Sequence, residues 1–580
     1  MTGSPRYLPI LAGAALAACA TVPPGPPPAS PASLAAEPKV ATEQAGRPAA
    51  EAIPAEVMYQ VLVAEVAMQR GQLDVAIDNY LRLGRQLRDA RMVERAARVA
   101  VYAHDNRKAL EAAKLWVELA PDKLEARQVA TALYIRNGEL DAAEHELEAM
   151  LAVQAGDQNK GFMLIAGLLG RQQDKEAALQ VMRKLVTKRS DDPYALFAYS
   201  HLAVRVGELG EAEQAVDRVV ELKPDWVEAL IQRARVLTMR GKPRDALASL
   251  RQAVEVRAED VQLRIAYARM LVDGKHYEEA YAQFQRVNDA KPGRPDVLIA
   301  LGMLAMQLEQ LEEAESYFLE LNHSSLGYQS ESSFYLGRIA EELRKDKDSA
   351  IKWYSKVDEG ETYLDAHIRV AVLLAQQGDL DLARGHLRAI TPRGSGQLLR
   401  IYLAEGQILQ DAGRYQEAMD VFTAGLGELP DNSELLYARG IVAEKLGRLD
   451  LMEADLKRII EREPDNAEAL NALGYSLADH TKRYEEALGY IQRALDLRPD
   501  SHYILDSMGW VQYRLGHYEE ALKYLKRAMA LNQDPEIAAH MTEVLWVLGD
   551  EQGAREVWDQ AFKVAPGNKF LLDVMDRLKK

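Results

Sequence analysis

Apolar residues along this chain recur every three or four positions, and small residues recur on a longer, equally regular spacing. From residue 76 onward, fifteen positions are separated by 33 to 36 residues, and fourteen of the fifteen are alanine. Leu, Tyr, Phe and Met surround them at helical spacing, which predicts two amphipathic helices in each period. A small residue at this place lets the second helix approach the first closely. The anchor positions are Ala76, Ala109, Ala143, Ala178, Ala212, Ala246, Ala280, Ala314, Ala350, Ala383, Ala418, Met452, Ala487, Ala521 and Ala554.

Glycine and proline mark the ends of the predicted helices. Glycine precedes the anchor by five residues in nine units, where a tight turn between helices favours left-handed backbone. Proline follows the anchor by twelve residues in seven units and ends the second helix, because it has no N–H to donate. The glycines are Gly71, Gly138, Gly207, Gly241, Gly378, Gly413, Gly447, Gly516 and Gly549. The prolines are Pro121, Pro224, Pro292, Pro430, Pro464, Pro499 and Pro566.

Helix hairpins of this kind form a stack in which each unit buries its apolar face against its neighbours. A chain of 580 residues is too long for one globular core, and the stack accounts for residues 55–566 without one. The units that start near Glu331 and Ala467 carry an extra residue, which we place in the turn. Residues 567–580 are expected to form a capping helix with one apolar face. That face carries Leu571, Leu572, Met575 and Leu578.

The period and its motif resemble the tetratricopeptide repeat (TPR). Two copies are clear: Ala472-Leu473-Gly474-Tyr475 leads through Tyr484-Glu485-Glu486-Ala487 to Pro499, and Met508-Gly509-Trp510 leads to Tyr518-Glu519-Glu520-Ala521. The resemblance covers essentially residues 56–580 and implies an all-α TPR α-solenoid of about 15 helix-hairpin units with a superhelical course. It implies a framework for binding other proteins and says little about which proteins are bound.

The first nineteen residues have the pattern of an export signal. Leu8 to Ala18 is an apolar run too short to span a membrane, and it leads into Leu16-Ala17-Ala18-Cys19, which resembles a bacterial lipobox. The resemblance implies that residues 1–18 are a lipoprotein signal peptide and that Cys19 is lipidated, which anchors the chain in a membrane. Ala20 resembles the outer-membrane sorting signal. Residues 19–54 are expected to form a disordered Pro/Ala-rich tether, since nine of residues 20–54 are proline.

Composition excludes several classes of function. The formal net charge of −17 opposes binding to the phosphates of nucleic acid. With a single cysteine there is no intramolecular disulfide or thiolate zinc cage, and no two of the eleven histidines lie within five residues of each other. Nucleophile elbows, Walker loops and dinucleotide fingerprints are absent from the sequence. We therefore expect no enzymatic activity, no cofactor and no metal.

The first helices of TPR units line a concave groove, and three sets of candidate protein-binding residues fall on that face. Aromatic and arginine side chains are the ones that most often anchor protein interfaces. The first set is Arg91 and Arg98, with Arg88 and Arg95 close by; the second is Tyr194, Phe197, His201, Arg235 and Arg269; the third is Tyr475, Trp510, Tyr513 and Arg514, with Tyr503 and Trp546 nearby.

Each set has a structural alternative. The arginines could form a solvated face paired with Asp89 and Glu94. The aromatic residues could be core instead of groove, because an error of one residue in register moves a side chain from one to the other. If Trp510 and Tyr513 face the groove, their double replacement by alanine weakens partner binding and leaves the helices folded.

A closer resemblance follows from the combination of lipobox, tether and uninterrupted array. The strings from Asn471 to Asp479, Asp506 to Trp510 and Asp534 to His540 are similar to those of the outer-membrane TPR lipoprotein that partners a periplasmic carboxyl-terminal processing protease in pseudomonads. The resemblance implies an adaptor that faces the periplasm, binds and activates the protease and brings it peptidoglycan hydrolases as substrates.

Two rival functions remain open from the sequence. One is a scaffold for exopolysaccharide export or envelope assembly, which also uses lipidated TPR arrays. The other is a glycan-binding or enzymatic protein that uses the aromatic groove. Recovery of a serine protease with cell-wall hydrolases favours the adaptor, whereas recovery of synthase or porin components favours export.

Overall fold

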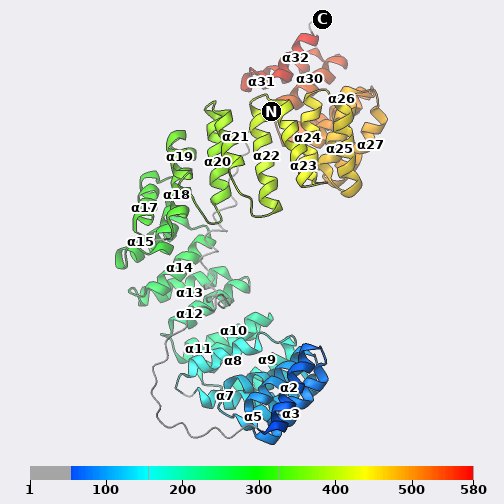
Figure 1. Ribbon diagram of the computed structural model, residues 1–580. Helices are drawn as coiled ribbons and strands as arrows, with labels where there is room; N and C mark the ends of the chain where they lie inside the picture. Colours follow the sequence, from blue (N-terminus) through cyan, green and yellow to red (C-terminus); the bar gives the residue numbers. More distant parts are fainter. Residues whose placement is uncertain (1–53, 155, 325–326, 579–580) are drawn as a thin grey trace, which may run out of the picture. The chain divides into compact units, whose positions relative to one another are not determined.

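The computed structural model describes residues 54–154, 156–324 and 327–578. The predicted signal peptide, Cys19 and the tether up to residue 53 lie outside these residues. Within them the secondary structure is helical and contains no β-strand, as the sequence predicted (Figure 1). The chain divides into two compact units, Met1–Tyr317 and Phe318–Lys580, which are described separately.

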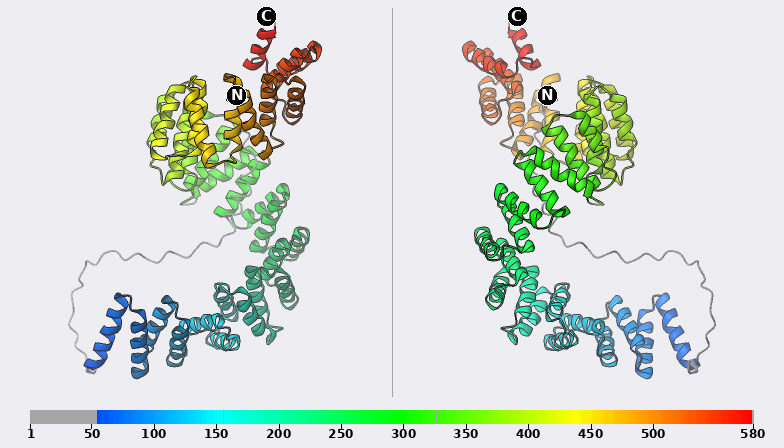
Figure 2. Two further views of the ribbon diagram at one scale, coloured as in Figure 1. Left: turned by 90° about the vertical axis from the view of Figure 1, so that its right-hand side faces the viewer. Right: turned by 90° about the vertical axis from the view of Figure 1, so that its left-hand side faces the viewer.

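The first unit is a succession of helix hairpins in which even-numbered helices are the first and odd-numbered helices the second of each repeat (Figures 1 and 2). Its helices are α2 (Ala55–Gln69), α3 (Leu73–Leu87), α4 (Ala90–Tyr102), α5 (Asn106–Leu119), α6 (Leu124–Arg136), α7 (Leu140–Val153), α8 (Gln158–Leu169), α9 (Lys175–Thr187), α10 (Pro193–Val206), α11 (Leu209–Leu222), α12 (Val227–Met239), α13 (Pro243–Val256), α14 (Val261–Asp273), α15 (Tyr277–Ala290) and α16 (Pro295–Gln307).

The second unit has the same alternation of first and second helices. The boundary between the units, between Tyr317 and Phe318, falls within α17 (Leu311–Ser324). Its helices are α18 (Gln329–Arg338) with the π-helix η1 (Ile339–Leu343), α19 (Lys347–Tyr354), α20 (Tyr363–Gln376), α21 (Leu380–Arg388), α22 (Ser395–Asp411), α23 (Tyr415–Glu428), α24 (Ser433–Lys445), α25 (Leu449–Arg462), α26 (Ala467–His480), α27 (Tyr484–Leu497), α28 (His502–Arg514), α29 (Tyr518–Leu531), α30 (Pro535–Val547), α31 (Glu551–Val564) and α32 (Lys569–Leu578).

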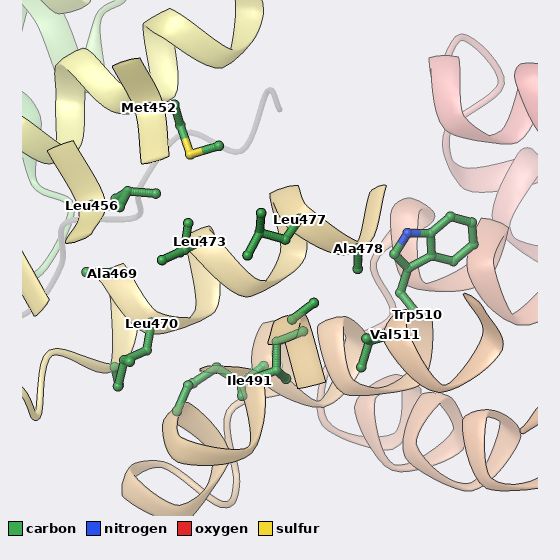
Figure 3. Close-up of a cluster of buried hydrophobic side chains, with 14 of the residues drawn as sticks. Met452, Leu456, Ala469, Leu470, Leu473, Leu477, Ala478, Ile491, Trp510 and Val511 are labelled. Carbon is green, nitrogen blue, oxygen red and sulfur yellow. The ribbon is translucent and has the colours of Figure 1, made fainter. Parts of the chain in front are cut away.

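The anchor residues confirm the predicted hairpin packing. All fourteen anchor alanines have no exposed surface, and Met452, which replaces alanine in one unit, is 2% exposed. Glycine in a first helix also lets the two helices of a hairpin approach closely. A Cβ built on Gly474 of α26 would lie 2.5 Å from Cγ1 of Ile491 in α27. Figure 3 shows the side chains around this contact, which belong to one continuous apolar core running from α22 to α30.

The predicted turn and stop signals are also confirmed. All nine glycines that precede an anchor by five residues have positive φ, for example 72° at Gly71 and 101° at Gly207. Four other units place His104, Lys275, Glu309 or Lys345 in the same left-handed conformation. Each of the seven second helices that precede a predicted proline ends two residues before it, because the proline ring excludes helical backbone at the residue in front.

One sequence prediction about the turns is wrong. In the unit that starts near Glu331, the first helix itself widens into the π-helix η1, in which the N–H of Arg344 donates to the carbonyl of Ile339 at 3.0 Å. A π-turn absorbs an inserted residue without breaking the helix, so the repeat keeps its packing. In the unit that starts with Ala467 the added residue does lie in the turn, where Thr481 is extended.

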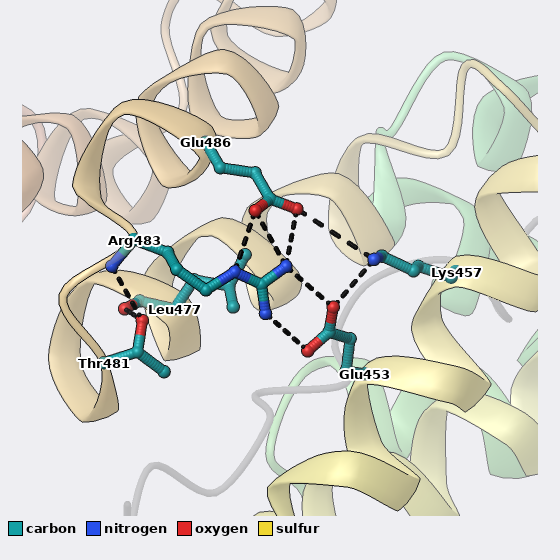
Figure 4. Close-up of polar contacts among 6 residues, drawn as sticks. All are labelled: Glu453, Lys457, Leu477, Thr481, Arg483 and Glu486. Atoms are coloured by element: carbon teal, nitrogen blue, oxygen red, sulfur yellow. Dashed lines mark hydrogen bonds and ion pairs between the residues drawn. The ribbon is translucent and has the colours of Figure 1, made fainter.

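Ion pairs tie successive second helices together at the surface (Figure 4). The guanidinium of Arg483, which caps α27, donates to Glu453 of α25 at 2.8 and 2.9 Å and to Glu486 at 2.7 and 2.8 Å. Lys457 lies 2.7 Å from the Glu453 carboxylate. The hydrogen bonds from Arg483 and Lys457 lower the pKa of Glu453 to about 2. This network fixes one repeat against the next.

The last helix, α32, covers the end of the array. It buries Leu571 and Val574 against Ala538 and Ala539 of α30. Leu572 was predicted to share this apolar face, and that prediction is wrong because its side chain is 44% exposed. Residues 571 and 574 are separated by nearly one full turn of helix, whereas residue 572 is rotated by about 100° from residue 571.

Candidate protein-binding surfaces

The structure brings the third candidate set together on three successive first helices. Tyr475 lies on α26, Trp510 and Tyr513 lie on α28, and His540 of α30 completes the group. The Trp510 ring stacks on His540 with centroids 4.3 Å apart and on Tyr513 at 5.2 Å. In the sequence, His540 stands out only as the last residue of a motif string, which assigns it no role. Its partner lies about one repeat away, so no local pattern indicates the contact.

Trp510 is core and does not line an open groove. Its side chain is 4% exposed and belongs to the apolar cluster that runs through α26 and α28. Its indole Nε1–H donates to Oδ1 of Asp479 at 3.2 Å, so the polar end is satisfied within the protein. Groove exposure, the condition for replacing Trp510 and Tyr513 without cost, is therefore not met at Trp510, and we expect its removal to destabilise the fold because a buried indole leaves a cavity.

Carboxylates hold the polar ends of the other residues in this set. The Tyr475 hydroxyl donates to Glu536 at 3.0 Å, and the Tyr513 hydroxyl donates to Glu543 at 3.2 Å. His540 Nδ1 lies 2.9 Å from Oδ1 of Asp506. Each bond joins two different first helices and fixes the rotamers on both. The set is thus a preorganised network rather than a group of free side chains.

Burial controls the ionisation of this network. It raises the pKa of the Tyr475 hydroxyl, and the nearby Glu536 carboxylate adds to the effect. Burial also raises the pKa of Glu536 itself. For His540, burial favours the neutral ring, but the Asp506 carboxylate overcomes this and raises the pKa. The Asp506 carboxylate thus stabilises the protonated form of the His540 ring.

Arg514 and Tyr503 are the more accessible members of this region. The Arg514 guanidinium donates to the carbonyl oxygen of Asp479 at 3.1 Å and to the hydroxyl of Tyr484 at 2.9 Å. Its side chain remains 25% exposed. Tyr503 is 38% exposed and accepts a hydrogen bond from Arg498 at 3.2 Å. A partner can reach these two residues without displacing the core.

The second candidate set is divided between core and surface. Phe197 on α10 is 6% exposed and packs on Trp226 with ring centroids 4.5 Å apart, and Tyr194 packs on the same indole at 5.2 Å. His201 is half-buried, and burial with the nearby charge of Arg235 lowers its pKa to about 4. Its ring is therefore neutral at physiological pH. Trp226, which was not among the predicted residues, lies in the turn before α12.

The two arginines of this set differ in their surroundings. Arg235 on α12 is exposed. Arg269 on α14 is half-buried and lies 3.8 Å from a carboxylate oxygen of Asp296. Arg235 is therefore the more available of the two for a partner.

The first candidate set follows the structural alternative given above. Arg91 of α4 makes a two-pronged contact with Asp89, in which Nη2 lies 2.7 Å and Nε 3.1 Å from carboxylate oxygens. Arg98 lies 2.8 Å from Glu94 and 2.6 Å from Glu125. Both arginines are exposed, so water and salt screen these pairs and they add little to stability. They occupy the guanidinium groups that a partner would need.

A cavity of about 620 Å³ opens beside α21, α22 and α23. The cavity lies beside a short helix: α21 has nine residues, whereas α23 has fourteen. Its wall contains Glu405, which is 4% exposed and accepts from Arg384 at 3.0 Å and Arg388 at 2.6 Å. Apolar side chains such as Leu387 form the rest of the wall.

The comparisons with known proteins agree with this architecture. Profiles described as tetratricopeptide repeat match residues 132–195, 237–297, 295–321, 403–451 and 477–545. The TPR repeat-containing protein PA4667 of Pseudomonas aeruginosa is 39% identical over 486 residues, which cover 84% of this chain and 82% of that protein. The chain belongs to the TPR protein family.

Other similarities are more limited in extent. Human tetratricopeptide repeat protein 13 is 33% identical over 104 residues, which cover 17% of this TPR chain and 12% of the human protein. The crystal structure of TTC0263, a TPR protein of Thermus thermophilus, aligns with 32% of the chain and 97% of its own length, at 26% identity and a TM-score of 0.28.

TPR proteins typically act as non-enzymatic scaffolds that bind other proteins. Among the residues that the structure describes, no group of three His, Cys, Asp or Glu side chains could hold a metal ion. No helix in residues 54–154, 156–324 and 327–578 combines the length and apolarity needed to cross a bilayer. Surfaces of the two helix stacks are candidates for protein binding, as in other TPR proteins.

Proposed function

We propose that this TPR protein is a lipid-anchored adaptor of the outer membrane that faces the periplasm. It binds and activates a carboxyl-terminal processing protease and presents peptidoglycan hydrolases to it. The observation that carries the proposal is the succession of helix hairpins in each of the two units, which multiplies recognition surface along the chain. The lipobox pattern at Cys19 and the motif strings near the C-terminus support the location and the partner.

The proposed mechanism is scaffolding. When a protease and its substrate bind to one array, the second encounter becomes intramolecular, at an effective concentration of about millimolar for a short connection. Proteolysis is then accelerated without any chemistry by the adaptor. Rigid networks such as the one around Trp510 suit this role, because a stiff stack holds two bound proteins at a constant separation.

Co-purification from envelope extracts tests the partner. The full chain, purified with its bound proteins, should recover a serine protease and cell-wall hydrolases. Adding the chain to purified protease and hydrolase should accelerate degradation. Recovery of polysaccharide synthase or porin components instead, or binding of purified glycan with no protein partner, would overturn the proposal in favour of another function.

A single substitution tests the membrane location. Cys19→Ser removes the sulfur to which lipid is attached, so the variant should leave the membrane fraction and appear in the soluble periplasmic fraction. The substitution lies outside the helix array and should leave the circular dichroism of the chain unchanged. Retention of the variant in the outer-membrane fraction would contradict the lipid anchor.

A further inference from the structure

The beginning of the helix array carries positive charge in an otherwise acidic protein. Residues 70–108 contain eight arginines and one lysine against five aspartates and glutamates, whereas the whole chain has a formal net charge of −17. Most of these cations have acidic partners at the surface. Binding of an anionic ligand therefore depends on the cations that have no acidic partner.

Two such cations line a single cavity. It has a volume of about 630 Å³ and lies between α3 and α5, the second helices of the first two repeats. Its lining residues are Asp78, Leu81, Arg82, Arg85, Gln86, Arg107, Lys108 and Glu111. We call this cavity the α3–α5 groove. It lies on the second helices, whereas Arg91 and Arg98 lie on the first helix α4.

The two carboxylates of the α3–α5 groove are already occupied. Lys108 lies 2.8 Å from Asp78, and hydrogen bonding to this carboxylate raises the pKa of Lys108. Arg85 pairs with Glu111 across the two helices. These contacts neutralise four of the six charged residues of the groove and fix the spacing of α3 and α5.

Arg82 and Arg107 supply the remaining charge. Arg82 is on α3 and Arg107 is on α5, and both side chains are exposed. Within the described part of the chain, neither guanidinium has a hydrogen-bond or ion-pair partner. The groove therefore presents two uncompensated guanidinium groups, one from each wall, above Leu81, which is 3% exposed.

The chemistry of the α3–α5 groove specifies its ligand. A guanidinium group binds a carboxylate through two parallel N–H···O bonds, which makes arginine well suited to acidic side chains. The screening length at physiological salt is about 8 Å, so a short bound segment responds to Arg82 and Arg107 more than to the distant acidic surface. A long polyanion would extend beyond this region and meet the net negative charge.

From these observations, we propose that the α3–α5 groove binds an acidic segment of a partner protein through Arg82 and Arg107. The segment lies between the two second helices, with one carboxylate on each arginine. The proposal uses only the general role of a TPR array in binding proteins. It does not depend on which protease or hydrolase is bound.

A labelled peptide provides the direct test. The probe is a terminally blocked, fluorescent decapeptide of alternating glutamate and glycine, and its control has glutamine in place of glutamate. Binding to the full chain is measured by fluorescence anisotropy at low and at physiological salt. The glutamate peptide should bind, its affinity should fall as salt increases, and the glutamine peptide should bind at least about tenfold more weakly, a difference of about 1.4 kcal/mol.

Charge-matched variants locate the site. Arg82→Gln with Arg107→Gln should weaken the glutamate peptide by about tenfold or more. Arg136→Gln with Arg171→Gln removes the same charge from two exposed arginines of the same unit. These two arginines also have no ion-pair partner in the described ranges, and their replacement should change the affinity less than twofold. Circular dichroism should be the same for both variants, since all four residues are exposed.

Two results would overturn the proposal. One is equal peptide affinity in the chain, the Arg82/Arg107 variant and the Arg136/Arg171 variant. The other is displacement of the peptide by phosphatidylglycerol vesicles that bind more tightly with the same dependence on Arg82 and Arg107, since the site would then belong to a membrane. Either result leaves co-purification of the protease unaffected, so failure here is distinguishable from failure of the proposed adaptor function.

Discussion

Replacement of Trp510 by alanine separates a structural role for the C-terminal aromatic set from a direct role in recognition. The Trp510 indole is 4% exposed, stacks on His540 at 4.3 Å and donates to Asp479 at 3.2 Å. Trp510, on α28, therefore links its own helix to α30 through His540 and to α26 through Asp479. Because almost none of its surface reaches solvent, its main contribution is to hold these helices together.

The expected cost follows from this burial. Removing a buried tryptophan side chain costs about 3–5 kcal/mol through lost apolar contacts and the cavity left behind. A domain of roughly 150–250 residues loses about 2–4 °C in Tm for each kcal/mol, so Trp510→Ala should lower the Tm of the second unit by about 6–20 °C. Since repeats interact only with their neighbours, the loss should concentrate in α26, α28 and α30.

Thermal unfolding followed by circular dichroism measures the total effect, and hydrogen exchange measures where it falls. Amides of α26, α28 and α30 should exchange faster in Trp510→Ala, while those of the first unit stay unchanged. Tyr503→Ala is the matched control, because Tyr503 is 38% exposed and its loss should cost about 0.5 kcal/mol or less. If Trp510→Ala unfolds at the original temperature and abolishes partner binding, the core assignment is refuted.

Two further predictions concern the same unit. Gly474→Ala should destabilise it by about 1–3 kcal/mol in urea unfolding, because the new Cβ would meet Ile491 at 2.5 Å. Gly489 is the control, because it lies at an exposed helix position where an added Cβ would have no described atom of another element within 4 Å. Gly489→Ala should therefore stabilise the second unit by about 0.5–1 kcal/mol. A Gly474→Ala protein as stable as the original would contradict the close approach of α26 and α27. The raised pKa of His540 predicts stability that is fully present below about pH 6.5, the unfolded value, and is lost as pH rises through the folded pKa. His540→Gln should flatten this dependence, and an unchanged pH profile would show that another group is responsible.

The hairpin repeat could be predicted from the sequence because its signals are local. Alanine at the anchor acts on a helix only a few residues away, glycine acts on its own turn, and proline acts on the residue in front of it. The buried anchor alanines, the positive φ angles and the helix ends before proline all agree with this. The sequence predicted that the extra residue of the unit near Glu331 lies in the turn, whereas it lies in the π-helix η1. An insertion in a turn and an insertion in a π-helix lengthen the repeat by the same amount, so the repeat spacing does not distinguish them.

The candidate surfaces were predicted less well, because exposure depends on residues about one repeat away. Trp510 is buried because His540 of the next first helix covers its ring. Phe197 is buried because Trp226 folds over it from the following turn. A rotation of about 100° per residue separates core from groove on a helix, and periodicity alone does not resolve that difference.

The sequence by itself determined that this chain folds as stacked helix pairs, since each pair is specified by small residues, turns and stops within its own 34 or so residues. Only the tertiary structure decided which side chains are available for binding. Arg91 and Arg98 are engaged by acidic residues, whereas Arg82 and Arg107 in the α3–α5 groove have no such partner among the residues that the structure describes. Neighbour contacts build the fold, but the charge left uncompensated at a surface depends on how side chains from different repeats meet.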